Sequence, residues 1–377
     1  CTCCHSSQTA NHLGPLRGAF FPRHVFHPPS LPGLGELCPA RGRLAVKGFT
    51  MGFILRRFSF YLVAFLVAAT INFLLPRAMP GDPVSVMFAR AGAMMEPAAL
   101  EALKATFGFV DGPITTQFLA YVKSVFTWDL GTSVRYYPQP VADVLGRAIG
   151  WTLFLVGTST ILSFSIGSIV GIFAAWYRGG RMDSILSPLT LVMQAIPPVV
   201  VSLLALFLFG VSLGWLPIGY AYSPEIPADF GWEHIKSIML HAIMPVGTLA
   251  MVQVGGFLIT MRNNMINLLG EDYITMAKAK GLSSNRVIFN YGARNAVLPS
   301  VTALSMALGF VIGGSLITEV IFNYPGLGLT LYQGILARDY PLIQGQLLIM
   351  TITMLSFNFL ADVLYVFLDP RLRTGGK

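Results

Sequence analysis

The most informative stretch of this 377-residue chain reads Glu271-Asp272-Tyr273-Ile274-Thr275-Met276-Ala277-Lys278-Ala279-Lys280-Gly281-Leu282. Acidic residues at its start and lysines at its end complement the partial charges of helix termini. Gly281 stands where a helix often ends in a residue with positive φ. The stretch therefore predicts a short helix, whose small residues Ala277, Ala279 and Gly281 would let a groove of another protein approach the backbone closely. The alternative is a solvated amphipathic loop without a partner.

The composition around this helix is that of a membrane protein. Hydrophobic residues make up 54% of the chain and charged residues 11%, well below the roughly 25% charged residues of soluble domains. Several apolar runs reach the roughly 20 residues that a helix needs to cross a bilayer. We expect an all-α integral membrane protein with six transmembrane helices, at residues 58–75, 151–176, 185–211, 238–260, 299–321 and 342–368.

The basic residues indicate how these spans are oriented. The net charge is +8, but lysine and arginine concentrate in short loops beside the spans, which is typical of membrane orientation rather than of nucleic-acid binding. The loop 261–298 and the C-terminal tail are basic, which predicts that both termini and this loop are cytoplasmic. Segment 76–150 then lies outside the cell, where helix-period apolar residues at Pro97–Phe107 and Ile114–Trp128 predict helices.

Residues 1–50 differ from the rest of the chain. They are rich in Pro, His and Gly, show no sustained periodicity and contain all four cysteines. The sequence Cys1-Thr2-Cys3-Cys4-His5 lacks the second spaced ligand pair of a zinc site, so metal binding is the weaker interpretation. We interpret residues 1–50 as a disordered leader outside the native protein, and residues 51–377 as the transmembrane domain.

The sequence predicts no catalytic, cofactor-binding or metal site. It lacks the Gly-x-x-x-x-Gly-Lys-Ser/Thr pattern that cradles ATP phosphates, and it has no His–Glu pair with zinc spacing. Three polar residues within the spans, Asn72, Gln194 and Gln253, could line a passage for a polar solute. The alternative is that they form hydrogen bonds between helices. Pro197 and Pro198 follow Gln194 and must interrupt the third span.

Two carboxylates and several glycines lie within or beside the predicted spans. Glu319 and Asp362 fall near span ends, where a charged group can reach water or a basic partner, and neither is placed like a proton relay at the membrane centre. Gly255-Gly256, Gly309 and Gly313-Gly314 allow close contacts between helices that could slide, or simply tight packing.

Several motifs together resemble one family. Pro80-Gly81-Asp82-Pro83 follows the first span, and Asp129-Leu130-Gly131-Thr132-Ser133 precedes the second. The run Glu319-Val320-Ile321-Phe322-Asn323-Tyr324-Pro325-Gly326-Leu327-Gly328 follows the fifth, and Leu360-Ala361-Asp362-Val363-Leu364-Tyr365 lies near the end. Their order and spacing resemble the permease subunits of ABC importers for dipeptides, oligopeptides and nickel, of the first-permease type. Such permeases generally carry Glu-Ala-Ala before the glycine, whereas this chain has Thr275-Met276-Ala277, which puts the glutamate's role in doubt but not the docking helix.

The resemblance implies a type I ABC importer permease in the prokaryotic inner membrane. It implies a second homologous permease as heterodimer partner, two cytoplasmic ATPase subunits that use ATP and Mg, and an extracytoplasmic solute-binding protein. It further implies that the helix within Glu271–Leu282 docks into an ATPase subunit. The chain itself would bind no cofactor and no nucleic acid, and would not be an enzyme.

Two questions stay open at this point. The expected substrates are di- and oligopeptides, with oligosaccharides and nickel complexes as alternatives within the same transporter class. A different class, an ion-coupled secondary transporter, would rely on acids at the membrane centre or on paired discontinuous helices. The spans contain no convincing example of either.

Overall fold

The computed structural model describes residues 40–78, 113–227 and 231–368, with side chains described except at 40–53, 76–78, 309–314 and 364–368. Within these residues the chain is helical, without a strand, and an isolated β-bridge joins Thr132 and Pro140. The all-α expectation is thus confirmed for the described part. In chain order the elements are α1 (Ala40–Ala78), α4 (Ile114–Thr127), α5 (Val141–Trp176), α6 (Arg181–Ala195), α7 (Pro198–Ala205), the π-helical η1 (Leu206–Ser212), α8 (Trp232–Leu269), α9 (Asp272–Ala279), α10 (Ser284–Arg286), the π-helical η2 (Val287–Ala293), α11 (Arg294–Gly314), α12 (Leu316–Ile321), α13 (Leu327–Ala337) and α14 (Tyr340–Leu368).

Among the described residues, four helices are long and apolar enough to cross a membrane, namely α1, α5, α8 and α14. A fifth span results if α6 and the α7–η1 segment, which meet at a bend of 93°, count as one broken span. This break falls at Pro197-Pro198, as the prolines predicted. The predicted span 299–321 covers α11 and α12, which separate at Ser315. The count of six spans stays a prediction.

Several helices extend beyond the predicted spans, while the predicted domain boundaries stay predictions. Helix α1 begins at Ala40, so residues 40–50 of the predicted leader are helical, and the chain divides into two compact units between Ala45 and Val46. Residues 141–150, predicted as part of the outer segment, are the first turns of α5. Helix α4 confirms the helix predicted at Ile114–Trp128. The helix predicted at Pro97–Phe107 and the Pro80–Pro83 motif lie outside the described residues.

Helices α5 and α8 make the most extensive helix contact of the described residues. Gly167 and Gly171 lie one turn apart on α5 and face α8. A Cβ atom at Gly167 would lie 2.7 Å from the carbonyl oxygen of Val254, and one at Gly171 would lie 2.6 Å from that of Leu258. This Gly-x-x-x-Gly contact lets the two backbones touch, which is how small residues pack helices in membranes.

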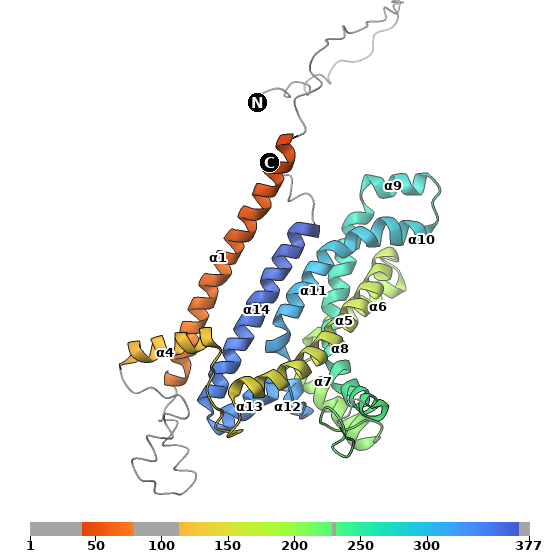
Figure 1. Ribbon diagram of the computed structural model, residues 1–377. Coiled ribbons are helices and arrows are strands. Elements are labelled where there is room, and N and C mark those ends of the chain that lie inside the picture. Colours follow the sequence, from red (N-terminus) through yellow and green to blue (C-terminus); the bar gives the residue numbers. More distant parts are fainter. Residues whose placement is uncertain (1–39, 79–112, 228–230, 369–377) are drawn as a thin grey trace, which may run out of the picture. The chain divides into compact units, whose positions relative to one another are not determined.

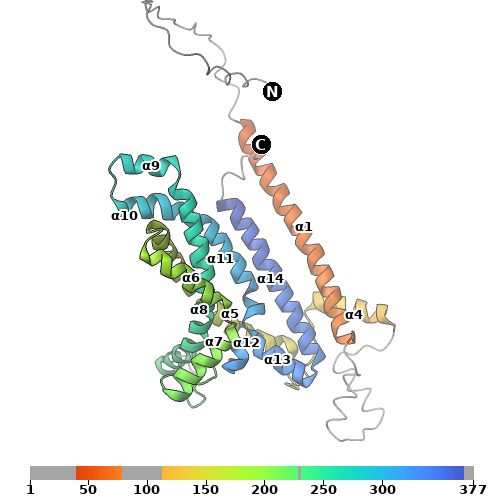
Figure 2. The same cartoon turned by 180° about the vertical axis from the view of Figure 1, so that it is seen from behind.

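Helix α14 lies between α1 and α11 (Figures 1 and 2). Asp362 on α14 accepts a hydrogen bond of 2.7 Å from the Tyr61 hydroxyl and pairs with Arg57 at 3.2 Å, both on α1. Asp362 therefore has the basic partner that its place near a span end predicted.

Helix α12, which carries Glu319, lies at the end of the helices opposite α9 (Figure 1). Glu319 is 0% exposed, so the prediction that its carboxylate reaches water or a basic partner is wrong. The hydroxyls of Thr152 and Ser315 donate to it at 2.8 and 2.7 Å, and the backbone N–H groups of Gly328 and Leu329 donate at 2.6 and 3.2 Å. Gly328 and Leu329 belong to the first turn of α13, whose N–H groups have no partner within the helix. The carboxylate therefore joins α5, α12 and α13.

A second buried carboxylate explains the Asp129–Ser133 motif. Asp339, which is 0% exposed, accepts hydrogen bonds from the Ser133 hydroxyl, the Arg135 N–H and the Leu342 N–H. Leu342 lies in the first turn of α14. The motif therefore fixes the α4–α5 connection to the start of α14.

Candidate functional site

Helix α9 follows α8 directly and lies at the end of the helices where α6 begins (Figure 1). Glu271 precedes it with extended backbone and no side-chain capping bond, so the acidic residues act on the helix terminus through their charge. At the other end the N–H groups of Gly281 and Leu282 donate to the carbonyls of Lys278 and Ala277 at 2.9 and 3.3 Å. Gly281 has φ +71°, which confirms the predicted positive φ at the end of the helix.

One face of α9 packs against the chain itself. Ile274 and Ala277 are 0% and 3% exposed and form a small core cluster with Val287 of η2, against which Leu282 and Trp176 also pack. The prediction that Ala277 faces a partner's groove is therefore wrong. Ala277 lies three residues after Ile274, so both point to the same side of the helix, and Ile274 is the apolar residue that this side buries.

The opposite face of α9 is exposed. Met276 there is 62% exposed. Lys278 lies four residues after Ile274, at the edge of the buried face, and its Nζ atom lies 5.4 Å from the ring centre of Trp176 on α5, within cation–π distance. Thus Lys278 ties α9 to α5 while staying accessible. The residues of the predicted docking set that are exposed are Glu271, Asp272, Tyr273, Lys278, Ala279, Lys280 and Gly281.

An ion pair fixes α6 to α8 at the same end. The guanidinium of Arg262 donates to both carboxylate oxygens of Asp183, at 2.7 and 2.9 Å. The same carboxylate accepts from the Gly179 N–H at 3.1 Å and from the Ser187 hydroxyl at 3.0 Å. Such bidentate pairs fix orientation as well as distance, so the ends of α6 and α8 are held together.

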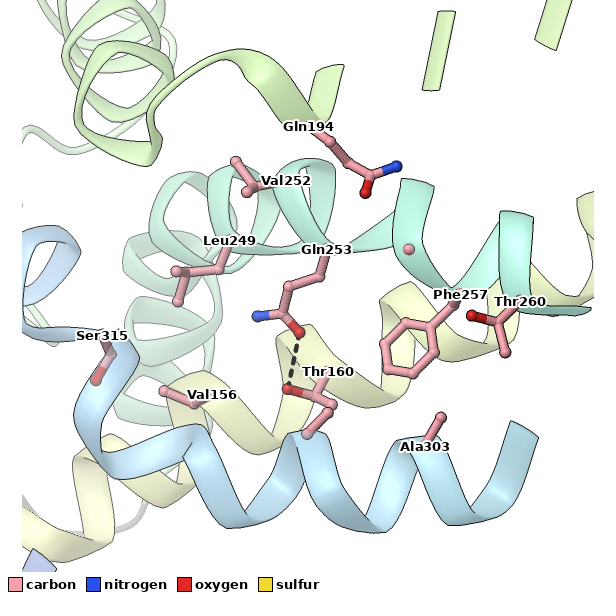
Figure 3. Close-up of a pocket in the computed structure, with 12 residues that line it drawn as sticks. Val156, Thr160, Gln194, Leu249, Val252, Gln253, Phe257, Thr260, Ala303 and Ser315 are labelled. Carbon is pink, nitrogen blue, oxygen red and sulfur yellow. Dashed lines mark hydrogen bonds between the residues drawn. The ribbon is translucent and has the colours of Figure 1, made fainter. Parts of the chain in front are cut away.

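A cavity of about 450 Å³ lies between α5, α6, α8 and α11 (Figure 3). This volume falls within the range of small-molecule sites. Its apolar walls include Leu249, Val252 and Phe257. The polar side chains that line it are those of Thr160, Gln194, Gln253, Thr260 and Ser315.

Gln194 and Gln253, two of the three predicted passage residues, thus line one cavity. The Thr160 hydroxyl donates to Oε1 of Gln253 at 3.1 Å, and Nε2 of Gln194 donates to the Thr190 carbonyl at 3.2 Å. A Cβ atom at Gly255 would lie 2.9 Å from Nε2 of Gln194, so α6 crosses α8 closely at this glycine, as predicted. At Gly256 an added Cβ would meet no atom within 4 Å.

The third predicted passage residue, Asn72, does not line this cavity. It is 5% exposed, and its Nδ2 donates to the Gln344 carbonyl on α14 at 2.9 Å and to the Tyr121 hydroxyl on α4 at 3.2 Å. Asn72 therefore joins helices, which was the alternative interpretation. Hydropathy places a polar residue within a span but does not say which side of the helix faces protein.

The sequence carries no signal for the places of Thr160 and Ser315 in the cavity, because hydroxyl side chains are common in helices. It also does not single out the Arg262–Asp183 pair, whose members lie 79 residues apart.

Comparison with known proteins gives a consistent result along the chain. Residues 167–374 match the family described as binding-protein-dependent transport system inner membrane component, and residues 50–148 match the N-terminal domain of such membrane components. A predicted peptide transport system permease protein from Brucella abortus is 33% identical over 320 residues, which cover 85% of this chain and 98% of the relative. The glutathione transport system permease protein GsiC from Salmonella choleraesuis is 31% identical over 323 residues, or 86% and 99% of the two chains.

Proposed function

Because this chain belongs to the family of inner membrane components of binding-protein-dependent transport systems, we propose that it is the permease subunit of an ATP-driven importer of di- and oligopeptides. The family is one of transport permeases, and the apolar helices fit a multi-pass membrane protein. ATP and Mg would be used by separate ATPase subunits, and this chain would bind neither.

The observation that carries the proposal is the arrangement of α9. Its buried face is packed on η2 and α5, whereas Tyr273, Met276 and Ala279 are exposed on the rest of its surface. A helix held in this way can transmit a displacement to its neighbours, which a loosely attached loop cannot. We infer that α9 docks into an ATPase subunit through this exposed face and that Ala277 serves the packing beneath it.

The transport step would be a switch between packed states rather than a chemical reaction. Closure of the ATPase subunits on ATP would move α9, which follows directly after α8, the helix that carries Gln253. The cavity beside Gln253 and Gln194 would then open alternately to the two sides of the membrane.

The substrate assignment rests on the relatives. Their names refer to peptides and to glutathione, which is itself a tripeptide derivative. Oligosaccharides and nickel complexes remain the alternatives. No histidine or cysteine is among the described side chains that line the cavity, which disfavours direct binding of a bare metal ion.

The proposed assembly contains a second, homologous permease, two cytoplasmic ATPase subunits and an extracytoplasmic binding protein. A heterodimer is proposed because one set of six spans is too small to enclose a path for a peptide. Both termini and the loop 261–298 would be cytoplasmic, and segment 76–150 would lie outside.

The test is uptake of a labelled tripeptide by vesicles that contain this chain with its partner permease, the ATPases and the binding protein. Uptake should require ATP and the binding protein, and a proton or sodium gradient alone should not support it. Gradient-driven uptake without ATP would refute the proposal and favour an ion-coupled transporter. Transport by the purified monomer would refute the heterodimer, and uptake of oligosaccharides but not peptides would correct the substrate.

A further inference from the structure

The side-chain amide of Gln253 on α8 has its oxygen fixed by a hydrogen bond and its NH₂ group available to a ligand. The Thr160 hydroxyl of α5 donates to Oε1 at 3.1 Å, which orients the amide plane. In Figure 3 the Nε2 atom points away from Thr160, on the side that Leu249 lines. Among the described residues Nε2 makes no hydrogen bond. An amide NH₂ group carries two donors, so the cavity contains a positioned donor without a protein acceptor.

The rest of the cavity restricts what this donor can bind. The described lining residues include no ionisable side chain, and the walls around Gln253 are formed by Leu249, Val252 and Phe257. A charged group of a solute would lose its water here without gaining an opposite charge, which is costly. A neutral carbonyl oxygen is a strong acceptor that needs only a donor. The chemistry of the cavity therefore suits an amide carbonyl.

Resting on the proposed function, we propose that the cavity binds the backbone of the transported peptide and that Nε2 of Gln253 donates to one of its carbonyl oxygens. Thr160 acts as a positioning residue, because it touches Gln253 and sets which end of the amide faces the solute. Every peptide offers the same carbonyl group whatever its side chains. The contact therefore holds peptides without selecting their sequence, and selection is left to the binding protein.

The test compares uptake of tri-alanine, Ala-Lys-Ala and Ala-Glu-Ala, at concentrations below saturation, by vesicles that contain the complete transporter. Gln253→Met keeps the shape of the side chain and removes the donor. Loss of one neutral hydrogen bond should lower uptake by about fivefold to tenfold, and by the same factor for all three peptides. Thr160→Val should lower uptake less than Gln253→Met does. Thr160→Ser keeps the hydroxyl and should take up peptide like the wild type.

Combining the Thr160 and Gln253 substitutions tests whether Thr160 acts through Gln253. If Thr160 acts only through Gln253, then Thr160→Val should have no further effect in the Gln253→Met background. The matched control is Thr158→Val on the same helix, because Thr158 is exposed and its hydroxyl donates to the Phe154 carbonyl at 2.6 Å. Thr158→Val should leave uptake unchanged.

Assembly of each variant is measured by co-purification of the ATPase subunits. If the Gln253→Met transporter does not assemble, Gln253→Asn is measured instead. Asparagine is one methylene shorter, so its donor should not reach the peptide, and uptake should fall by a similar factor for all three peptides. Unchanged uptake, a loss that depends on peptide charge, or additive effects of the two substitutions would each overturn the inference. If the wild-type transporter imports no peptide with ATP, the proposed function fails and this inference falls with it, whereas normal wild-type uptake with unaffected variants refutes the inference alone.

Discussion

Replacing Gly167 by Ala should destabilise the protein, whereas the same change at Gly157 on the same helix should not. The new Cβ at Gly167 would lie 2.7 Å from the Val254 carbonyl oxygen, 0.7 Å closer than the 3.4 Å at which ordinary contact begins. It would also lie 2.9 Å from Cβ of Phe257. None of these atoms is at the end of a flexible side chain, so α5 and α8 must move apart. At Gly157 an added Cβ meets nothing within 4 Å.

The expected magnitude follows from the cost of overpacking, about 1–3 kcal/mol for an added methyl group in a packed interior. The difference in helix propensity between Gly and Ala, about 1 kcal/mol, acts equally at both positions and cancels in the comparison. Gly157→Ala should therefore unfold like the wild type or slightly later, and Gly167→Ala should lose about 1–3 kcal/mol relative to it. Gly171→Ala should resemble Gly167→Ala, because its Cβ would lie 2.6 Å from the Leu258 carbonyl oxygen.

The assay is unfolding of the purified chain in mixed micelles by titration with SDS, followed by circular dichroism and tryptophan fluorescence. The free energy of unfolding is compared among the three variants at the same micelle composition. If Gly167→Ala and Gly157→Ala agree within about 0.5 kcal/mol, the usual effect of a surface substitution, then α5 and α8 do not touch at Gly167 and the packing argument is wrong.

Three further substitutions and one deletion test other parts of the structure. Gly281→Ala should weaken co-purification of the ATPase subunits moderately, because the φ of +71° at this position costs an alanine about 1 kcal/mol. Ala277→Glu should abolish co-purification, because it places a charge in a buried cluster. Glu319→Gln should lower the free energy of unfolding by about 1–3 kcal/mol, because an NH₂ group would then meet backbone N–H donors such as that of Gly328, and an unchanged SDS titration would contradict this role. A chain that begins at Met51 should transport peptide as well as the full chain, and loss of uptake at normal expression would show that residues 1–50 contribute to function.

The local features of the site could be predicted from sequence because they depend on few residues. Gly281 ends α9 with positive φ because residues with a Cβ are disfavoured there, and Pro197-Pro198 break the third span because proline lacks the N–H donor of a helix. The buried face of α9 could also be predicted from the sequence. Ile274 and Ala277 have helical spacing, and a large apolar residue such as Ile274 indicates that this side of the helix is buried.

The contact made by Gly167 and Gly171 has a recognisable sequence motif. Gly167-Ser168-Ile169-Val170-Gly171 is a Gly-x-x-x-Gly motif within an apolar helix, which predicts close helix packing, though not which helix is the partner. The partner, α8, is set by tertiary structure.

Glu319 could not have been placed from sequence in the same way. Its hydroxyl donor Thr152 lies 167 residues earlier, and its backbone donors belong to α13, which begins after a turn. A carboxylate in an apolar segment ordinarily indicates a span end or a functional acid. Here it replaces the missing hydrogen-bond partners of a helix start, and Gly326 and Gly328 are glycines because a Cβ at either position would collide with its carboxylate.

The contacts of α8 show how a movement of α9 would reach the cavity. Helix α8 joins α9 at one end, packs on α5 through Gly167 and Gly171, and carries Gln253 along its length. Because the α5–α8 contact is made by backbone atoms, these two helices cannot separate easily and should move together. Helix α6 is attached to α8 by the Arg262–Asp183 pair and by the close approach at Gly255. Helix α11 is attached to α8 as well, because Nδ2 of Asn264 donates to the Ser300 hydroxyl at 3.2 Å and to the Ala296 carbonyl at 3.5 Å. A displacement of α9 would therefore pass through α8 to all the other helices that line the cavity.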